Sequence, residues 1–178
     1  MTTSPLSKTT VAVAALGLLA IIARTQPSVK PTAPPDTLQF YGNPQSPIAA
    51  GVGVPAGTAL LFTSGTPPPV VDKAAPAGSR ARFGDTRTQA EGILKTLETQ
   101  LKEKGLSLKD VIYLRVYVVP DAQKGNKPDF EGWFAAYGAS FNNAANPTRV
   151  ARSTISVPAL VNPDWLIEIE AVAAYPKP

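Results

Sequence analysis

Apolar residues recur with helical spacing in the middle of the chain, between Thr86 and Lys104. The charged residues of this segment lie off the apolar stripe, which is typical of a helix that packs one face against the protein. Asp85 suits an N-cap and Gly105 a C-terminal stop, so a helix is predicted from about Thr86 to Lys104. The stripe consists of Ala90, Ile93, Leu94, Leu97 and Leu101.

A second helical pattern is made of aromatic residues and is predicted to start near Pro128, which suits a first helical position. Stripes of this kind belong to a core more often than to a ligand site, so we interpret this one as core. Its members recur at three- and four-residue spacing and are Phe130, Trp133, Phe134, Tyr137 and Phe141.

Runs rich in β-branched and aromatic residues predict the strands. The loop between the second of these strands and the first helix is predicted to be long and irregular, because residues 66–82 contain four prolines and a glycine. The order of elements predicts an α+β domain, with two helices on one face of a mixed sheet. The predicted strands are residues 37–41, 59–64, 111–119, 151–157 and 166–174.

The first residues look like a targeting segment. Val11–Ala23 is an uncharged apolar run between Lys8 and Arg24, and it is shorter than the roughly 20 residues of a spanning helix. A buried core helix fits less well, because the run has no polar face. Residues 1–24 are therefore predicted to be a signal peptide or an N-terminal anchor.

This interpretation sets the expected localisation and the domain boundaries. The protein is expected to be periplasmic or secreted, or held at the membrane by a tether through residues 9–23 if the segment is retained. Residues 25–36 contain four prolines and are predicted to be an extended linker. The folded domain is predicted to span residues 37–178.

Composition narrows the chemistry. The chain of 178 residues is 44% apolar, enough for one domain with a core. It has no His and no Cys, which excludes Ser-His-Asp and Cys-His triads, His or Cys zinc sites and thiol redox chemistry. The net charge of +4 is spread along the chain, so no nucleic-acid partner is predicted. No metal or organic cofactor is predicted either.

The strongest candidates for chemistry lie in the last quarter of the chain. Arg152 heads one predicted strand, and Glu168 lies on the next strand after an Asn162–Asp164 turn. Two strands joined by a turn can place both side chains close together on one sheet. An arginine beside a glutamate can hold a small carboxylate substrate and move a proton on it. The structural alternatives are a salt bridge at Arg152 and a solvated strand face at Glu168 and Glu170.

Six segments, taken in order, resemble motifs of the RidA/YjgF family of reactive intermediate deaminases. The resemblance implies a chorismate-mutase-like α+β fold, assembled as a homotrimer with a cleft between neighbouring subunits. It also implies hydrolysis of small 2-imino and enamine acids to 2-keto acids and ammonia. The segments are residues 61–65, 89–101, 105–111, 130–141, 151–154 and 167–173.

The resemblance also implies roles for individual residues. By position, Arg152 binds the substrate carboxylate, Ser64 is the pocket serine, and Glu168 orients or activates water. The backbone carbonyl of Thr154 lies in the same site.

The chain departs from the family at two places. An Asn of the family's second helix is replaced near Phe134, and the Tyr that the family often has near the start of its first strands is absent from Ser46–Ala49. These departures leave the substrate open.

Two other functions remain as alternatives. A protein of this fold with an arginine cleft could bind a carboxylate ligand, or act as an interaction protein, without turnover. RNA cleavage has been attached to family members, but this chain has no histidine for acid–base work on ribose.

Overall fold

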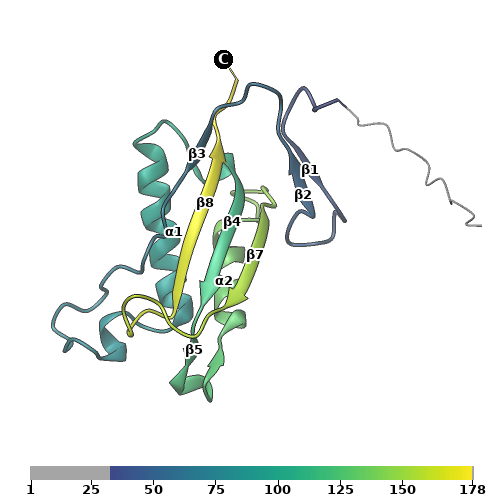
Figure 1. Ribbon diagram of the computed structural model, residues 1–178. Helices are drawn as coiled ribbons and strands as arrows, with labels where there is room; N and C mark the ends of the chain where they lie inside the picture. Colours follow the sequence, from purple (N-terminus) through teal and green to yellow (C-terminus); the bar gives the residue numbers. More distant parts are fainter. Residues whose placement is uncertain (1–32, 178) are drawn as a thin grey trace, which may run out of the picture. The chain divides into compact units, whose positions relative to one another are not determined.

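The computed structural model describes residues 33–177, which contain a four-stranded mixed sheet (Figure 1). The strand order is β3-β8-β4-β7, in which β4 and β7 are parallel and the other neighbours antiparallel. The predicted α+β class is confirmed. The strands are β3 (Leu60–Phe62), β8 (Ile167–Ala174), β4 (Val111–Val118) and β7 (Ala151–Ser156).

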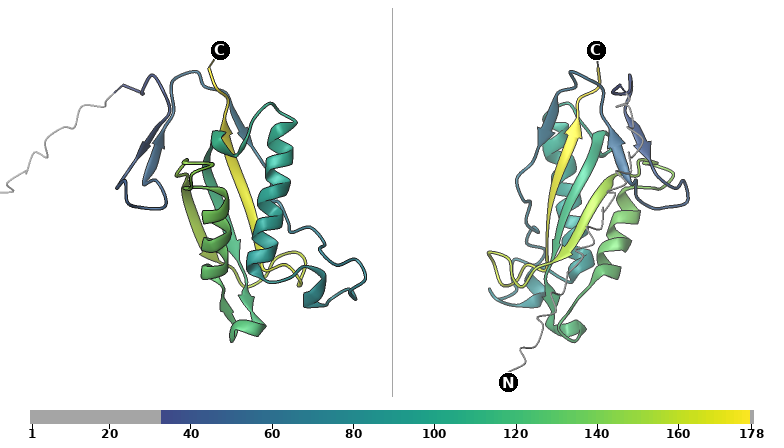
Figure 2. Two further views of the ribbon diagram at one scale, coloured as in Figure 1. Left: turned by 180° about the vertical axis from the view of Figure 1, so that it is seen from behind. Right: turned by 45° about the vertical axis from the view of Figure 1, so that its right-hand side comes forward.

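The two helices, α1 (Thr86–Lys102) and α2 (Phe130–Ser140), cover the same face of this sheet (Figures 1 and 2). Helix α1 begins where the sequence predicts, because the Asp85 carboxylate accepts a hydrogen bond from the Thr88 N–H at 2.8 Å. All five members of its apolar stripe are buried in the core, as predicted. The helix ends at Lys102, slightly before the predicted end at Lys104.

Helix α2 begins at Phe130 rather than at Pro128, which lies in a short strand instead. The cap is Asp129, whose carboxylate accepts from the Gly132 N–H at 3.0 Å. The interpretation of the aromatic stripe as core is right for Trp133, Tyr137 and Phe141, which are buried. It is wrong for Phe134, which is 47% exposed.

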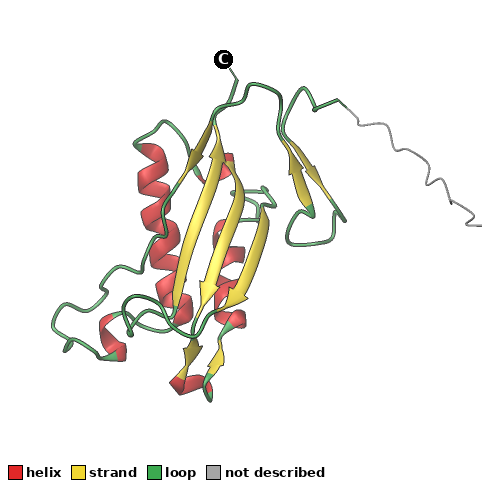
Figure 3. Ribbon diagram, viewed as in Figure 1, coloured by secondary structure: helices red, strands yellow, loops and turns green. Residues whose placement is uncertain are grey.

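The other face of the sheet is not covered by either helix (Figure 3). It exposes the apolar side chains of Phe62 and Ile155, with 69% and 47% of each accessible. An Arg115–Glu170 ion pair, with nitrogen and oxygen 2.8 Å apart, crosses from β4 to β8 on this face. We call this surface the open face.

The remaining elements are short. Strand β1 (Gln39–Tyr41) pairs with β2 (Gly51–Gly53) in a hairpin beside the main sheet (Figure 1). Strand β5 (Pro120–Asp121) pairs with β6 (Lys127–Pro128). Residues 66–82 are irregular as predicted, apart from a bridge at Thr66 and one turn of 3-10 helix at Arg80–Arg82.

Within residues 33–177, no helix is both long and apolar enough to cross a membrane. The predicted signal or anchor segment, residues 1–24, lies outside the described part of the chain.

Candidate active site

Arg152 lies on β7, and its side chain points toward α2. Its register partner on β4 is Leu114, a fully buried core residue, which places both on the helix side of the sheet. Three aromatic rings surround the guanidinium. Its Cζ lies 4.3 Å from the ring centroid of Tyr137, 4.7 Å from that of Phe134 and 5.4 Å from that of Trp133. These distances are typical of cation–π contacts.

Within residues 33–177, the guanidinium of Arg152 has neither an ion pair nor a hydrogen bond to the protein. Its Nη1 is fully enclosed and unpartnered, whereas Nε and Nη2 are not among the enclosed atoms. Burial lowers the pKa of this arginine from its usual value. The structural alternative, a salt bridge at Arg152, is therefore not present in the described chain. The side chain is a partly desolvated cation whose Nε–Nη2 edge remains free.

Thr154 supports this arrangement from the same strand. Its hydroxyl oxygen accepts a hydrogen bond from the Trp133 indole N–H at 3.2 Å, which fixes one ring of the aromatic cluster. The N–H of Val157 donates to the Val118 carbonyl, so alternate residues of β7 turn their backbone groups toward β4. Arg152 and Thr154 are the residues in between, so their backbone groups point away from β4. The Thr154 carbonyl therefore points to the outer edge of β7, beside Arg152.

Glu168 lies on β8 and on the opposite face. It alternates with the buried residues Ile167 and Ile169, so its side chain is on the open face. Its carboxyl group lies directly over Gly65, where an added Cβ would overlap it. This contact places the Glu168 carboxyl group beside Gly65, the residue that follows Ser64. No hydrogen bond or ion pair within residues 33–177 engages the Glu168 carboxylate.

The sequence-based expectation that Arg152 and Glu168 lie close together in one chain is wrong. Strand β4 is hydrogen-bonded to both β7 and β8 and separates them. The two strands are thus roughly 10 Å apart, since neighbouring strands are spaced about 4.8 Å. The side chains also point to opposite faces. One chain therefore presents two separate groups of candidate residues, which we call half-sites: Arg152 with Thr154 at the β7 edge, and Glu168 with Ser64 and Gly65 on the open face.

The neighbouring carboxylate, Glu170, has a structural role. It accepts hydrogen bonds from Arg115 at 2.8 Å and from the Tyr117 hydroxyl at 3.1 Å. Glu170 is thus held by two neighbours on the open face, whereas no described residue bonds to the Glu168 carboxylate.

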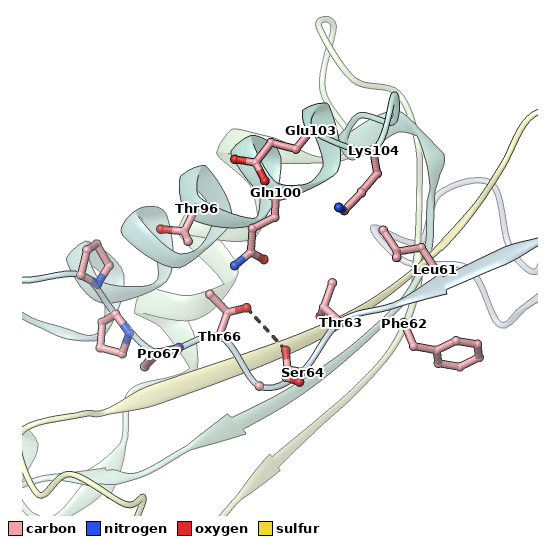
Figure 4. Close-up of a pocket in the computed structure, with 13 residues that line it drawn as sticks. Leu61, Phe62, Thr63, Ser64, Thr66, Pro67, Thr96, Gln100, Glu103 and Lys104 are labelled. Atoms are coloured by element: carbon pink, nitrogen blue, oxygen red, sulfur yellow. Dashed lines mark hydrogen bonds between the residues drawn. The ribbon is translucent and has the colours of Figure 1, made fainter.

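A cavity of ≈ 540 Å³ lies between β3 and the C-terminal half of α1. Figure 4 shows Gln100 and Lys104 pointing from the helix toward the strand, whereas the side chains of Phe62 and Ser64 point away from the helix. Ser64 and its neighbours line the cavity, but neither Arg152 nor Glu168 does. It lies on the other side of the sheet from the Glu168 carboxylate and is not the candidate site.

The aromatic cluster around Arg152 was not predicted as part of the site. The i, i+4 spacing of Trp133 and Tyr137 shows from sequence alone that both rings share one helix face. The spacing does not reveal which strand residue the rings meet, because that depends on how α2 packs on the sheet.

The chain is similar to known proteins over most of its length. A family model described as Endoribonuclease L-PSP matches residues 47–175, a segment that includes both half-sites. None of the curated proteins compared with the chain matches it.

Solved structures show the same similarity. The Rid-family protein YyfB of Yersinia pestis, described as of unknown function, is 26% identical, with a TM-score of 0.59 over 78% of this chain and 98% of that one. The Escherichia coli YjgF product is 29% identical, with a TM-score of 0.50 over 76% and 98%. Escherichia coli TdcF, solved with bound serine, is 27% identical, with a TM-score of 0.50 over 78% and 99%.

Proposed function

The chain belongs to the Endoribonuclease L-PSP family, the family of the YjgF and Rid proteins, and from this premise we propose that it hydrolyses small 2-imino and enamine acids to 2-keto acids and ammonia. Members of this family are often imine deaminases. The observation that supports the proposal is the state of Arg152, a half-buried cation with three aromatic neighbours and no carboxylate partner among the described residues.

Arg152 binds the substrate carboxylate through its free Nε–Nη2 edge. A guanidinium edge offers two parallel N–H donors, which match the two oxygens of a carboxylate. Burying a cation without a counter-ion is costly, and a bound anion would offset that cost. The serine bound to the related TdcF is a small molecule with a carboxylate, which supports a ligand of this class.

The site is completed by a neighbouring subunit, in a homotrimer. Glu168 and Ser64 cannot reach Arg152 within one chain, because β4 lies between them and the faces differ. The open face exposes Phe62 and Ile155, and a second copy would bury them. In this assembly the Arg152 half-site of one subunit faces the Glu168 half-site of the next.

The reaction needs only orientation and proton transfer. A water molecule, held by Glu168 and the Thr154 carbonyl, adds to the imine carbon. The Glu168 carboxylate accepts a proton from this water and passes it to the imine nitrogen. The adduct then passes its hydroxyl proton to the nitrogen and the carbon–nitrogen bond breaks, so that ammonia leaves and the keto oxygen comes from the water. An enamine reaches the same point after protonation at carbon. Positioned acid–base groups contribute typically 10²- to 10⁴-fold to such steps.

Binding of a carboxylate ligand without turnover is the second candidate. It is favoured by the same unpaired Arg152, because an anion site alone needs no positioned water. RNA cleavage, which the family's description names, is not proposed, because the chain has no histidine to act on ribose.

Imines generated in situ separate the two candidates. An amino-acid oxidase converts alanine or leucine to the 2-imino acid, and semicarbazide traps the imine that remains. The proposal predicts that the protein accelerates release of keto acid and lowers the trapped fraction. Binding of the keto acid by calorimetry, without any acceleration, would instead support the non-catalytic ligand-binding protein.

A further inference from the structure

Phe134 differs from the other two rings around Arg152. Trp133 and Tyr137 are 0% and 2% exposed and form the inner wall of the aromatic cluster. Phe134 is 47% exposed and forms its outer wall, 4.7 Å from the Arg152 Cζ. Among the three rings, Phe134 is therefore the one that a ligand bound at the guanidinium can contact from solvent.

A second ring extends this wall away from the arginine. Phe130 lies one helical turn before Phe134, and the two rings are stacked with centroids 6.3 Å apart and an angle of 16° between their planes. Phe130 is half-buried. The pair forms an apolar strip on α2 that begins at the Arg152 guanidinium and runs along the helix.

Packing within the described part of one chain does not account for the exposed Phe134 ring. In a stripe that otherwise enters the core, Phe134 keeps nearly half its surface in contact with solvent, which costs the protein the gain from burying it. Its position over the guanidinium also shields one side of the cation, so only the edge that carries Nε and Nη2 stays open to a ligand.

We propose that Phe134, with Phe130 behind it, determines substrate specificity by providing an apolar surface for the substrate side chain. This inference rests on the proposed function, because it assumes that the substrate carboxylate binds Arg152. With the carboxylate held there, the side chain on the adjacent carbon extends along the Phe134 ring. The favoured substrates are 2-imino acids with branched aliphatic or aromatic side chains, rather than the imino acid derived from alanine.

The expected size of this substrate preference depends on how much of the ligand side chain the Phe134 ring covers. One methylene group in an enclosed apolar pocket changes kcat/KM by about 10- to 200-fold. Because Phe134 covers only one side of the ligand, the whole side chain of leucine is expected to give about tenfold, at the lower end of this range. The same preference is expected in binding affinity, with 4-methyl-2-oxopentanoate bound more tightly than pyruvate.

The test compares imines derived from alanine and leucine in the full-length protein and in Phe134→Ala and Phe134→Leu. The unaltered protein should favour the leucine imine by about tenfold in kcat/KM. Phe134→Ala should bring this ratio close to one, and Phe134→Leu should keep most of it, because leucine preserves an apolar wall. Val161→Ala is the matched control, since Val161 is 93% exposed and lies in the loop between β7 and β8, outside both half-sites.

The outcomes separate this inference from the proposed function. Turnover of both imines with no preference, or an unchanged ratio in Phe134→Ala, would overturn the role of Phe134 and leave the deaminase intact. Absence of any turnover would overturn the deaminase. Calorimetry with pyruvate and 4-methyl-2-oxopentanoate then still decides on Phe134: a preference that is lost in Phe134→Ala supports its role, and equal binding contradicts it. Using the ratio of two ligands cancels any general damage to Arg152 or to folding.

Discussion

Two arginines in this protein, Arg80 and Arg152, are buried to a similar extent but differ in whether a carboxylate pairs with them. Arg80 forms a two-bonded ion pair with the buried Asp121, with nitrogen–oxygen distances of 2.6 and 2.8 Å. Arg152 is half-buried as well, but its neighbours are three aromatic rings and none of the described residues supplies a carboxylate. The first arginine is satisfied by the fold, whereas the second has no polar partner among the described residues.

This difference gives a physical criterion for separating structure from function. Removing one member of a satisfied pair leaves a buried charge unpaired and destabilises the protein. Removing an unsatisfied cation removes a desolvation cost and leaves stability nearly unchanged. The two arginines should therefore differ in which property, activity or stability, their variants lose.

The largest expected effect is that of Arg152→Ala on activity. Loss of both carboxylate hydrogen bonds should lower kcat/KM by about 10³-fold, because charge-assisted bidentate pairs are among the strongest polar contacts. Arg152→Lys should recover little, because an ammonium group cannot reproduce the planar edge. Keto-acid release measures the activity, and thermal unfolding of both variants should stay within a few degrees of the unaltered protein. Unchanged turnover would remove Arg152 from the site.

Glu168→Gln should lower kcat by about 10²-fold, since it removes a positioned proton acceptor but keeps the shape of the side chain. Binding of a keto acid, measured by calorimetry, should be little changed, because the carboxylate contact is made by Arg152. Glu170→Gln is the matched control on the same strand face. Because Glu170 is bonded by Arg115 and Tyr117, this variant should alter only those contacts on the open face and leave proton transfer unaffected.

The reverse pattern is expected for Arg80→Ala, which should lower the free energy of unfolding by about 2 kcal/mol while kcat/KM for the imine stays unchanged. Asp121 is 1% exposed, and without Arg80 its carboxylate would be buried unpaired. Chemical denaturation measures the stability. A loss of activity at full stability would mean that Arg80 serves the site, and the contrast with Arg152 would fail.

The same pair makes stability depend on pH. The hydrogen bonds from Arg80 hold the pKa of Asp121 below its usual value. A carboxyl group whose folded pKa is lowered contributes stability above its unfolded pKa of about 3.9, and this contribution is lost as the pH falls through the folded value. The stability difference between the unaltered protein and Arg80→Ala should therefore shrink below about pH 4. Arg152→Ala should show no such trend.

A smaller effect is expected for Gly65→Ala. The added Cβ would overlap the Glu168 carboxyl group, which can move aside because it is the end of a flexible chain. Activity should fall by about tenfold through misplacement of this carboxylate, with little change in stability. Gly138→Ala is the control: its Cβ meets nothing within 4 Å, and it should stabilise α2 by about 0.5 to 1 kcal/mol without affecting turnover.

The sequence predicts the local elements of this fold well. Helix α1 follows from the spacing of Leu94, Leu97 and Leu101 and from the Asp85 cap, both of which depend only on nearby residues. The start of α2 was placed near Pro128 because proline suits a first position, but the Asp129 carboxylate caps the helix one residue later. Local patterns thus locate elements to within a few residues.

The arrangement of the site could not be predicted in the same way. The turn between the last two strands suggested that β7 and β8 are neighbours, but β4 bonds to both, a choice made by long-range pairing. The sequence therefore marks Arg152 and Glu168 as candidates, but it misjudges their separation within one chain. Likewise, a stripe of aromatic residues does not reveal that Phe134 remains exposed over a strand arginine.

The central claim is that Arg152 of one subunit and Glu168 of the next form a single site. Co-expression of Arg152→Ala and Glu168→Gln chains tests it, because each homotrimer alone is expected to be nearly inactive. With random assembly, about one quarter of the subunit interfaces in the mixture would pair an intact Arg152 with an intact Glu168. The account predicts that the mixture recovers about one quarter of the unaltered activity per site. No recovery in mixed assemblies, verified by mass spectrometry of the intact complex, would contradict a site shared between subunits.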